Sequence, residues 1–294
     1  MAKRGKAGRG AAFDRETLRL IILVFVVGIA AGFWFGRRSV MAPKIVREKP
    51  TREAMPLEEK RKPFAFPFLK GAKPHGAPKL VIVVDDVGND DHLKDLLWSF
   101  PHSVTLAVIP RLPYSEYFSK EGKKRKFEII LHQPMEPLQP INQKDATMIK
   151  VGMPDDEIEK ILDQNLKSVS SAVGINNHMG SRATQDRKVM RAVLSELKKR
   201  RLFFLDSLTT SRSVGRDEAG LVGTPFLERT VFLDNELEPD YIHSQIEHLA
   251  QSARKNGAAI GICHYKWNTL TVLRDALSEL KSQGFEIVTL KDLL

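Results

Sequence analysis

Aspartate and histidine residues recur at the ends of short apolar runs in this sequence, such as KLVIVVDD, FEIILH and AAIGICH. The residues concerned are Asp85, Asp86, His132, His178, Asp206 and His264. Two imidazoles and a carboxylate are a common zinc-binding set that leaves positions open for water. A further carboxylate can accept a proton from water, and a further imidazole can protonate a leaving group. The residue types therefore predict metal-assisted hydrolysis.

Each of these residues also has a structural explanation. A single Asp after a strand is most often the N-cap of the next helix, which could account for Asp206 before Ser207. His132 taken alone would more often be structural than functional. Two adjacent buried acids such as Asp85 and Asp86 repel each other without a cation, which favours a site for that pair.

The elements that must position these residues begin at residue 79. Short apolar runs alternate there with amphipathic helical stretches, which indicates parallel βαβ units. The runs lie at 79–86, 103–110, 127–132, 174–179, 202–207, 230–234, 258–264 and 285–290. The fold class predicted is α/β, an irregular (β/α) barrel of about seven to eight parallel strands. An open doubly wound sheet is the alternative. In a barrel the carboxyl ends of the strands meet at one rim, so the polar residues would share a site.

The 294-residue chain carries a net charge of +10, but no zinc-finger spacing or RNP-type sequence supports nucleic-acid binding. The single cysteine, Cys263, excludes an intramolecular disulfide and a Cys-rich zinc site. Successive strand residues point to opposite faces, so Cys263 is expected in the core, facing away from His264.

The uncharged run at 20–36 predicts a single N-terminal transmembrane helix. A cleaved signal peptide ending near residues 39–42 is the alternative. The predicted organisation is a basic tail (1–19), the anchor (20–36), a linker rich in proline and charge (37–78), and one domain (79–294).

Five stretches resemble the motifs of the divergent polysaccharide deacetylase family: VVDDVG, FEIILHQPMEP, GINNHMGSRAT, LFFLDS and GICH. The resemblance covers about residues 79–294. It implies that Asp85 is the general base, that Asp86 and His132 bind a metal, and that His264 is the general acid. Asp206 would orient or charge-tune one of these groups.

The sequence departs from the usual pattern of deacetylases in two places. The second motif normally has two histidines but here has His132 alone, and the catalytic Arg of the third motif is absent. We expect His178, from a different strand, to be the third metal ligand. Asn177 and Arg182 are the candidate substrate-binding residues, with Arg182 standing in for the missing Arg.

These observations predict a membrane-anchored hydrolase, with a divalent metal, zinc in the first instance, that removes acyl groups from peptidoglycan or a related glycan. The resemblance places the domain on the periplasmic side of a bacterial inner membrane. A catalytically inactive glycan- or protein-binding scaffold is the first alternative, which predicts binding without product. The second is a glycosidase that pairs Asp85 or Asp86 with Asp206 and needs no metal.

Overall fold

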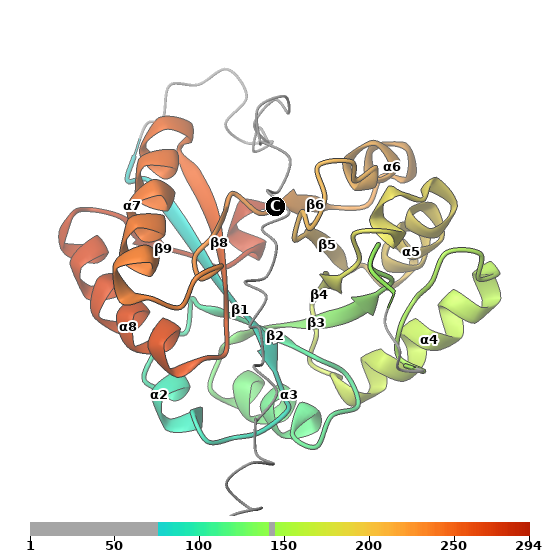
Figure 1. Ribbon diagram of the computed structural model, residues 1–294, viewed down its shortest axis with the longest axis horizontal. Coiled ribbons are helices and arrows are strands. Elements are labelled where there is room, and N and C mark those ends of the chain that lie inside the picture. The colour runs from blue at the N-terminus through green and yellow to red at the C-terminus, as the bar shows by residue number, and fades with distance from the viewer. Residues whose placement is uncertain (1–75, 141–144) are drawn as a thin grey trace, which may run out of the picture. The chain divides into compact units, whose positions relative to one another are not determined.

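Nine strands form one sheet in the part of the chain that the structure describes, and the paired strands run parallel (Figure 1). The computed structural model describes residues 76–140 and 145–294, which lie in one compact unit, Met55–Leu294. The strands are β1 (Lys79–Val87), β2 (Thr105–Val108), β3 (Glu128–Met135), β4 (Gly174–Met179), β5 (Phe203–Asp206), β6 (Phe226–Glu228), β7 (Val231–Phe232), β8 (Ala258–His264) and β9 (Glu286–Ile287).

The sheet is curled and stays open between its two edge strands. The strand order is β6-β5-β4-β3-β2-β1-β8-β7, so β6 and β7 lie at opposite edges although only Arg229 and Thr230 separate them. The chain itself crosses this gap. The N–H of Arg229 donates to the carbonyl of Asp206 at 3.0 Å, and the N–H of Thr230 donates to that of Ile260 at 2.8 Å. The predicted irregular barrel of parallel strands is confirmed in this coarser form, a curled and incompletely closed α/β sheet.

Helices form a layer outside the curled sheet (Figure 1). They are α2 (Lys94–Trp98), α3 (Ser115–Lys124), α4 (Asp155–Ser168), α5 (Arg187–Arg200), α6 (Gly215–Val222), α7 (Pro239–Asn256) and α8 (Trp267–Ser282), with the 3-10 turns η2 (Ala183–Gln185) and η3 (Lys291–Leu293). Sequence signals define several of their ends. The Asp186 side chain caps α5, Pro239 opens α7, and Gly257 closes α7 in a left-handed conformation.

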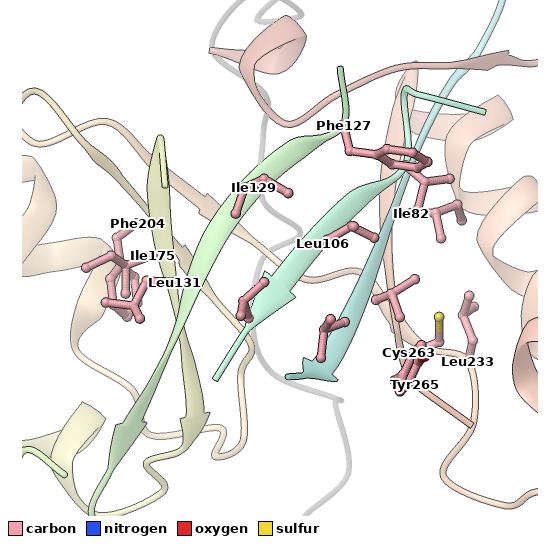
Figure 2. Close-up of a cluster of buried hydrophobic side chains, with 14 of the residues drawn as sticks. Ile82, Leu106, Phe127, Ile129, Leu131, Ile175, Phe204, Leu233, Cys263 and Tyr265 are labelled. Carbon is pink, nitrogen blue, oxygen red and sulfur yellow. The ribbon is translucent and has the colours of Figure 1, made fainter. Parts of the chain in front are cut away.

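Alternating strand residues build two apolar layers. One layer packs between the sheet and the helices and includes Ile82, Leu106, Ile129, Leu131 and Cys263 (Figure 2). The other fills the inside of the curl and includes Val83, Ile130 and Ile262, together with Leu290 and Leu293 from the C-terminal segment. Cys263 is fully buried in the outer layer, as predicted.

Three strand predictions differ from the structure. The run at 127–132 does not stop at His132, because β3 continues through Pro134 to Met135. The run at 285–290 forms only β9, which pairs with the amino-terminal end of β1, where Lys79 pairs with Glu286. β2 takes the rest of that edge, from Val83 onward. The short strand β6 was not predicted, because its apolar residues Phe226 and Leu227 form too short a run, and only 230–234 was assigned as a strand.

No helix among residues 76–140 and 145–294 is long and apolar enough to cross a membrane. The predicted tail, the predicted anchor at 20–36 and most of the predicted linker at 37–78 lie outside the described residues. These domain assignments therefore stay predictions.

Candidate metal centre

Strand alternation brings the site residues to the inside of the curl. Each of three inner apolar residues is followed two positions later by a polar one: Val83 by Asp85, Ile130 by His132, and Ile262 by His264. Asp85 and His264 lie at or near the carboxyl ends of their strands, whereas His132 lies within β3, which runs on to Met135. Asp85 and His132 are almost completely buried, whereas the side chains of Asp86, His178 and His264 keep about 30% of their exposure. The site therefore opens to solvent on one side.

Asp86 joins the site through a distortion at the end of β1. Adjacent residues of a regular strand point to opposite faces, so Asp85 and Asp86 should diverge. Asp86 has a φ of 62°, and the pairing of β1 with β2 loses its register between Val84 and Val87. Such a left-handed residue is uncommon outside glycine, although Asp tolerates it better than most. The distortion lets both neighbouring carboxylates approach His132.

Three ligand-type atoms form a nearly equilateral triangle. Oδ1 of Asp86 lies 3.3 Å from Nε2 of His132 and 3.1 Å from Nδ1 of His178, and the two nitrogens are 3.2 Å apart. Atoms bound tetrahedrally to zinc at about 2.0–2.1 Å are about 3.3 Å from one another. Oδ1 of Asp86 is buried and makes no well-aligned hydrogen bond to any described residue. This carboxylate and the two imidazoles fit a divalent metal.

Asn176 supports this triangle from β4. Its Oδ1 lies 2.8 Å from Nδ1 of His132, and its Nδ2 donates to Oδ1 of Asp85 at 2.9 Å. Oδ2 of Asp85 lies 3.5 Å from Nε2 of His132. The second carboxylate oxygen of Asp85 therefore faces the same point as the triangle.

The charges of these groups are strongly linked. Burial raises the pKa of Asp85, and the nearby His132 and His264 only partly offset it. Burial also acts to raise the pKa of Asp86, but the imidazoles of His132 and His178 outweigh it and hold that pKa far below its usual range. Burial acts to lower the pKa of His132, whereas Asp85 and Asp86 prevail and raise it. A proton on His132 therefore offsets the charge of Asp86, and a bound metal cation would take the place of that proton.

His264 is paired with a carboxylate of its own. Nδ1 of His264 lies 2.8 Å from Oδ1 of Asp234, whose Oδ2 accepts from the His264 N–H at 2.9 Å and from the Thr269 hydroxyl at 2.8 Å. Burial acts to lower the pKa of His264, but Asp234 outweighs it and raises the pKa to about 9. The imidazole is therefore protonated at neutral pH and can donate a proton.

An aromatic stack borders the His264 ring. The ring of Phe232 lies nearly parallel to it, with an interplanar angle of 13° and centroids 6.2 Å apart. The guanidinium of Arg229 covers Phe232 at 4.0 Å from the ring centroid, while its Nε donates to the carbonyl of Ser207 at 2.8 Å. Arg229, in the segment that crosses the gap in the sheet, thus packs on the ring that stacks against the candidate acid.

The remaining predicted residues form local contacts. The Asp206 carboxylate accepts from the Leu208 N–H at 2.8 Å and from the Ser213 hydroxyl at 2.5 Å. Phe204, two residues earlier in β5, belongs to the outer apolar layer. Because alternate residues of a strand share a face, Asp206 also points to that outer side. The catalytic role given to Asp206 stays a prediction.

Asn177 lies within β4, and Arg182 lies in the turn between β4 and η2. Asn177 is buried, its Oδ1 accepts from the Ser207 N–H at 2.9 Å, and its Nδ2 donates to the Met179 carbonyl at 2.7 Å. Arg182 is half exposed and forms an ion pair with Glu136 at 3.1 Å. Their predicted role in substrate binding is likewise untested by this geometry.

Sequence reasoning missed Asp234 and Asn176. Asp234 ends the run TVFLD in the same way that Asp206 ends LFFLD, so the signal was present but was not used. Asn176 stands beside Asn177 in GINNHM, and only the pairing of β3 with β4 shows that it lies opposite His132. A buried amide has no sequence signature comparable to that of a titratable residue.

Comparison with known proteins gives matches over most of the domain. The family model described as divergent polysaccharide deacetylase matches residues 82–294. An uncharacterized protein of Haemophilus influenzae is 36% identical over 204 residues, which cover 69% of this chain and 72% of that protein. The uncharacterized protein YibQ of Escherichia coli is 34% identical over 206 residues, or 69% of this chain and 64% of that protein.

One solved structure shares the fold closely. The crystal structure of an uncharacterized protein from Agrobacterium tumefaciens aligns with a TM-score of 0.72 at 23% identity, covering 76% of this chain and 93% of that one.

Proposed function

The chain belongs to the divergent polysaccharide deacetylase family, and from this premise we propose that it is a metal-dependent hydrolase that removes acyl groups from a cell-envelope polysaccharide. The observation that carries the proposal is the triangle of Asp86, His132 and His178, with sides of 3.1 to 3.3 Å. A carboxylate and a charged imidazole, Asp85 and His264, lie on adjacent strands beside it.

Asp86, His132 and His178 would hold the metal. When bound, a divalent cation lowers the pKa of water and polarises a carbonyl oxygen. Asp85 would take the proton of the attacking water through Oδ2, because Oδ1 is engaged by Asn176. The raised pKa of the buried Asp85 makes it a stronger base than an exposed carboxylate.

His264 would protonate the departing amine or alcohol. Its Nδ1 faces Asp234, so Nε2 is the nitrogen left to donate toward the site. Asp234 keeps the ring charged at neutral pH and orients it through the contact with Nδ1. The carboxylate of Asp234 is itself held by the His264 backbone N–H and by the Thr269 hydroxyl. This division of labour needs one group that starts unprotonated and one that starts protonated, which the two environments supply.

The substrate and location are proposed from the family and from the sequence. The family name points to acylated polysaccharide, and the uncharged run at 20–36 supports an anchor in the cytoplasmic membrane. Peptidoglycan, or a related glycan outside the cytoplasm, is then the expected substrate.

Acetate release tests this function. The purified full chain, loaded with zinc, should release acetate from chitooligosaccharides or peptidoglycan fragments. Asp85→Asn and His264→Ala should each lower kcat by about 10²- to 10⁴-fold. Both variants should still bind zinc, since neither residue belongs to the triangle. A metal-loaded chain that releases no acetate from any of these glycans would contradict the proposal.

A glycan-binding protein without turnover is the second candidate. Arg182, which would stand in for the family's catalytic Arg, is ion-paired with Glu136 and more than half exposed. This candidate predicts saturable glycan binding with no acetate released.

A further inference from the structure

Asn176 connects two groups to which the proposed function gives different tasks. It lies on β4 opposite His132, with which it pairs in the β3–β4 ladder. β1 lies three strands from β4, beyond β3 and β2, so Asn176 reaches Asp85 across the inside of the curl. The side chain is completely buried and has all its polar atoms engaged, with a third contact from Nδ2 to the Ser207 hydroxyl at 3.3 Å.

The direction of these hydrogen bonds follows from chemistry. A carboxylate only accepts, so the amide group that faces Asp85 at 2.9 Å must be the NH₂. The amide oxygen then faces His132 and can only accept, which requires the proton of a neutral His132 to be on Nδ1. Nε2 of His132 is left with its lone pair directed toward Asp86 and His178.

We propose that Asn176 is a positioning residue that prepares this site through both halves of its amide. The oxygen holds His132 in the tautomer whose Nε2 can bind a metal. The NH₂ group holds Asp85 so that its second oxygen faces the same centre. The second half of this inference rests on the proposed function, whereas the first half concerns the metal site alone.

Two substitutions separate the proposed effect on His132 from the proposed effect on Asp85. Asn176→Asp keeps an oxygen that accepts from His132 and replaces the NH₂ group that faces Asp85 with a second oxygen. Asn176→Leu keeps the branched shape of the side chain and removes both contacts. Asn165→Leu is the matched control, because Asn165 is also a buried amide, donates to Gln133 and Thr147, and does not contact the His132 ring.

Zinc affinity of the purified full chain, measured by competition with a chelator, reports the first half. We expect Asn176→Leu to weaken zinc binding by about 10- to 100-fold, the usual effect of removing a group that orients a ligand. Asn176→Asp and Asn165→Leu should stay within about threefold of the parent. The inference would be overturned if Asn165→Leu lost zinc affinity while Asn176→Leu kept it. Equal zinc affinity in the parent and all three variants would overturn it too.

The tautomer itself can be read without any variant. In the zinc-free parent at alkaline pH, where the ring is neutral, long-range ¹H–¹⁵N spectra should show His132 protonated on Nδ1. The same signature should persist in Asn176→Asp and become mixed in Asn176→Leu. A parent with the proton on Nε2 would contradict the assignment, whatever the variants do.

Turnover reports the second half. Asn176→Asp should bind zinc like the parent yet lose about tenfold or more in kcat, because Asp85 is no longer held in place. Full kcat in this variant would overturn the role toward Asp85. If the parent binds zinc and shows the expected tautomer but releases no acetate, the hydrolase function fails while the role toward His132 stands.

Discussion

The pair formed by His264 and Asp234 sets the pH range in which a proton donor is available. The folded pKa of His264, about 9, exceeds its ordinary value of 6.5. The protonated ring and the stability contributed by its pairing with Asp234 are therefore fully present below about pH 6.5 and are lost as the pH rises through about 9. A cation bound at the rim repels the imidazolium, so the metal-loaded protein should lose its acid at or below pH 9.

Asp234→Asn should move the alkaline limb of kcat/KM to lower pH. The substitution removes the charge that raises the pKa of His264, and burial then lowers that pKa. Activity near pH 8 should fall by about 10- to 100-fold and recover in part at lower pH. A pH–rate profile measures both effects. Asp275→Asn is the control, because Asp275 is an exposed partner of Arg274. An unchanged alkaline limb in Asp234→Asn would exclude His264 as the acid.

At the residue scale, strand ends and residue types were enough to select Asp85, Asp86, His132, His178 and His264, which the fold gathers at one rim. The strand ends could not show which of these side chains contact one another. Asp234 and Asp206 have nearly identical sequence settings, yet Asp234 contacts His264 and Asp206 contacts Ser213. That difference depends on which strands are neighbours, and the chain order does not contain it.

At the scale of elements, close approach between β4 and β5 requires a residue without a side chain. Gly174 pairs with Phe203, and a Cβ added at Gly174 would lie 2.4 Å from the Phe203 ring. Gly220 in α6 is the opposite case, because a Cβ there would meet nothing within 4 Å. The two glycines therefore predict opposite effects of the same substitution.

Gly174→Ala should destabilise the domain by about 1–3 kcal/mol through overpacking against the ring. Gly220→Ala should stabilise it by about 0.5–1 kcal/mol, since alanine has the higher helix propensity. Chemical denaturation of the two variants beside the parent measures both. A stable Gly174→Ala variant would show that β4 and β5 are not packed as described.

Element types were largely predictable because continuous apolar runs and amphipathic periods differ clearly. The closure of the sheet was not. The break at Arg229 and Thr230 carries the chain from one edge of the sheet to the other within two residues. Glu228, Arg229 and Thr230 separate two short apolar runs in TPFLERTVFLD, but nothing local shows that these runs lie at opposite edges of the sheet.

At the scale of the whole molecule, the predicted anchor determines which glycan the domain can reach. The full chain should fractionate with membranes, and deletion of residues 20–36 should move it to the soluble fraction. A C-terminal reporter that works only outside the cytoplasm should be active on the full chain. A full chain recovered in the soluble fraction, with its N-terminus intact, would contradict the anchor.

The metal content of the purified full chain tests the central claim most directly. After supplementation with zinc, cobalt, nickel or manganese, the parent should hold about one equivalent of metal, as expected for a three-ligand site. His132→Ala and His178→Ala should both lose it, while His243→Ala, on the outer helix α7, should keep it. A parent that binds none of these metals, or variants that bind as the parent does, would contradict a metal centre formed by Asp86, His132 and His178.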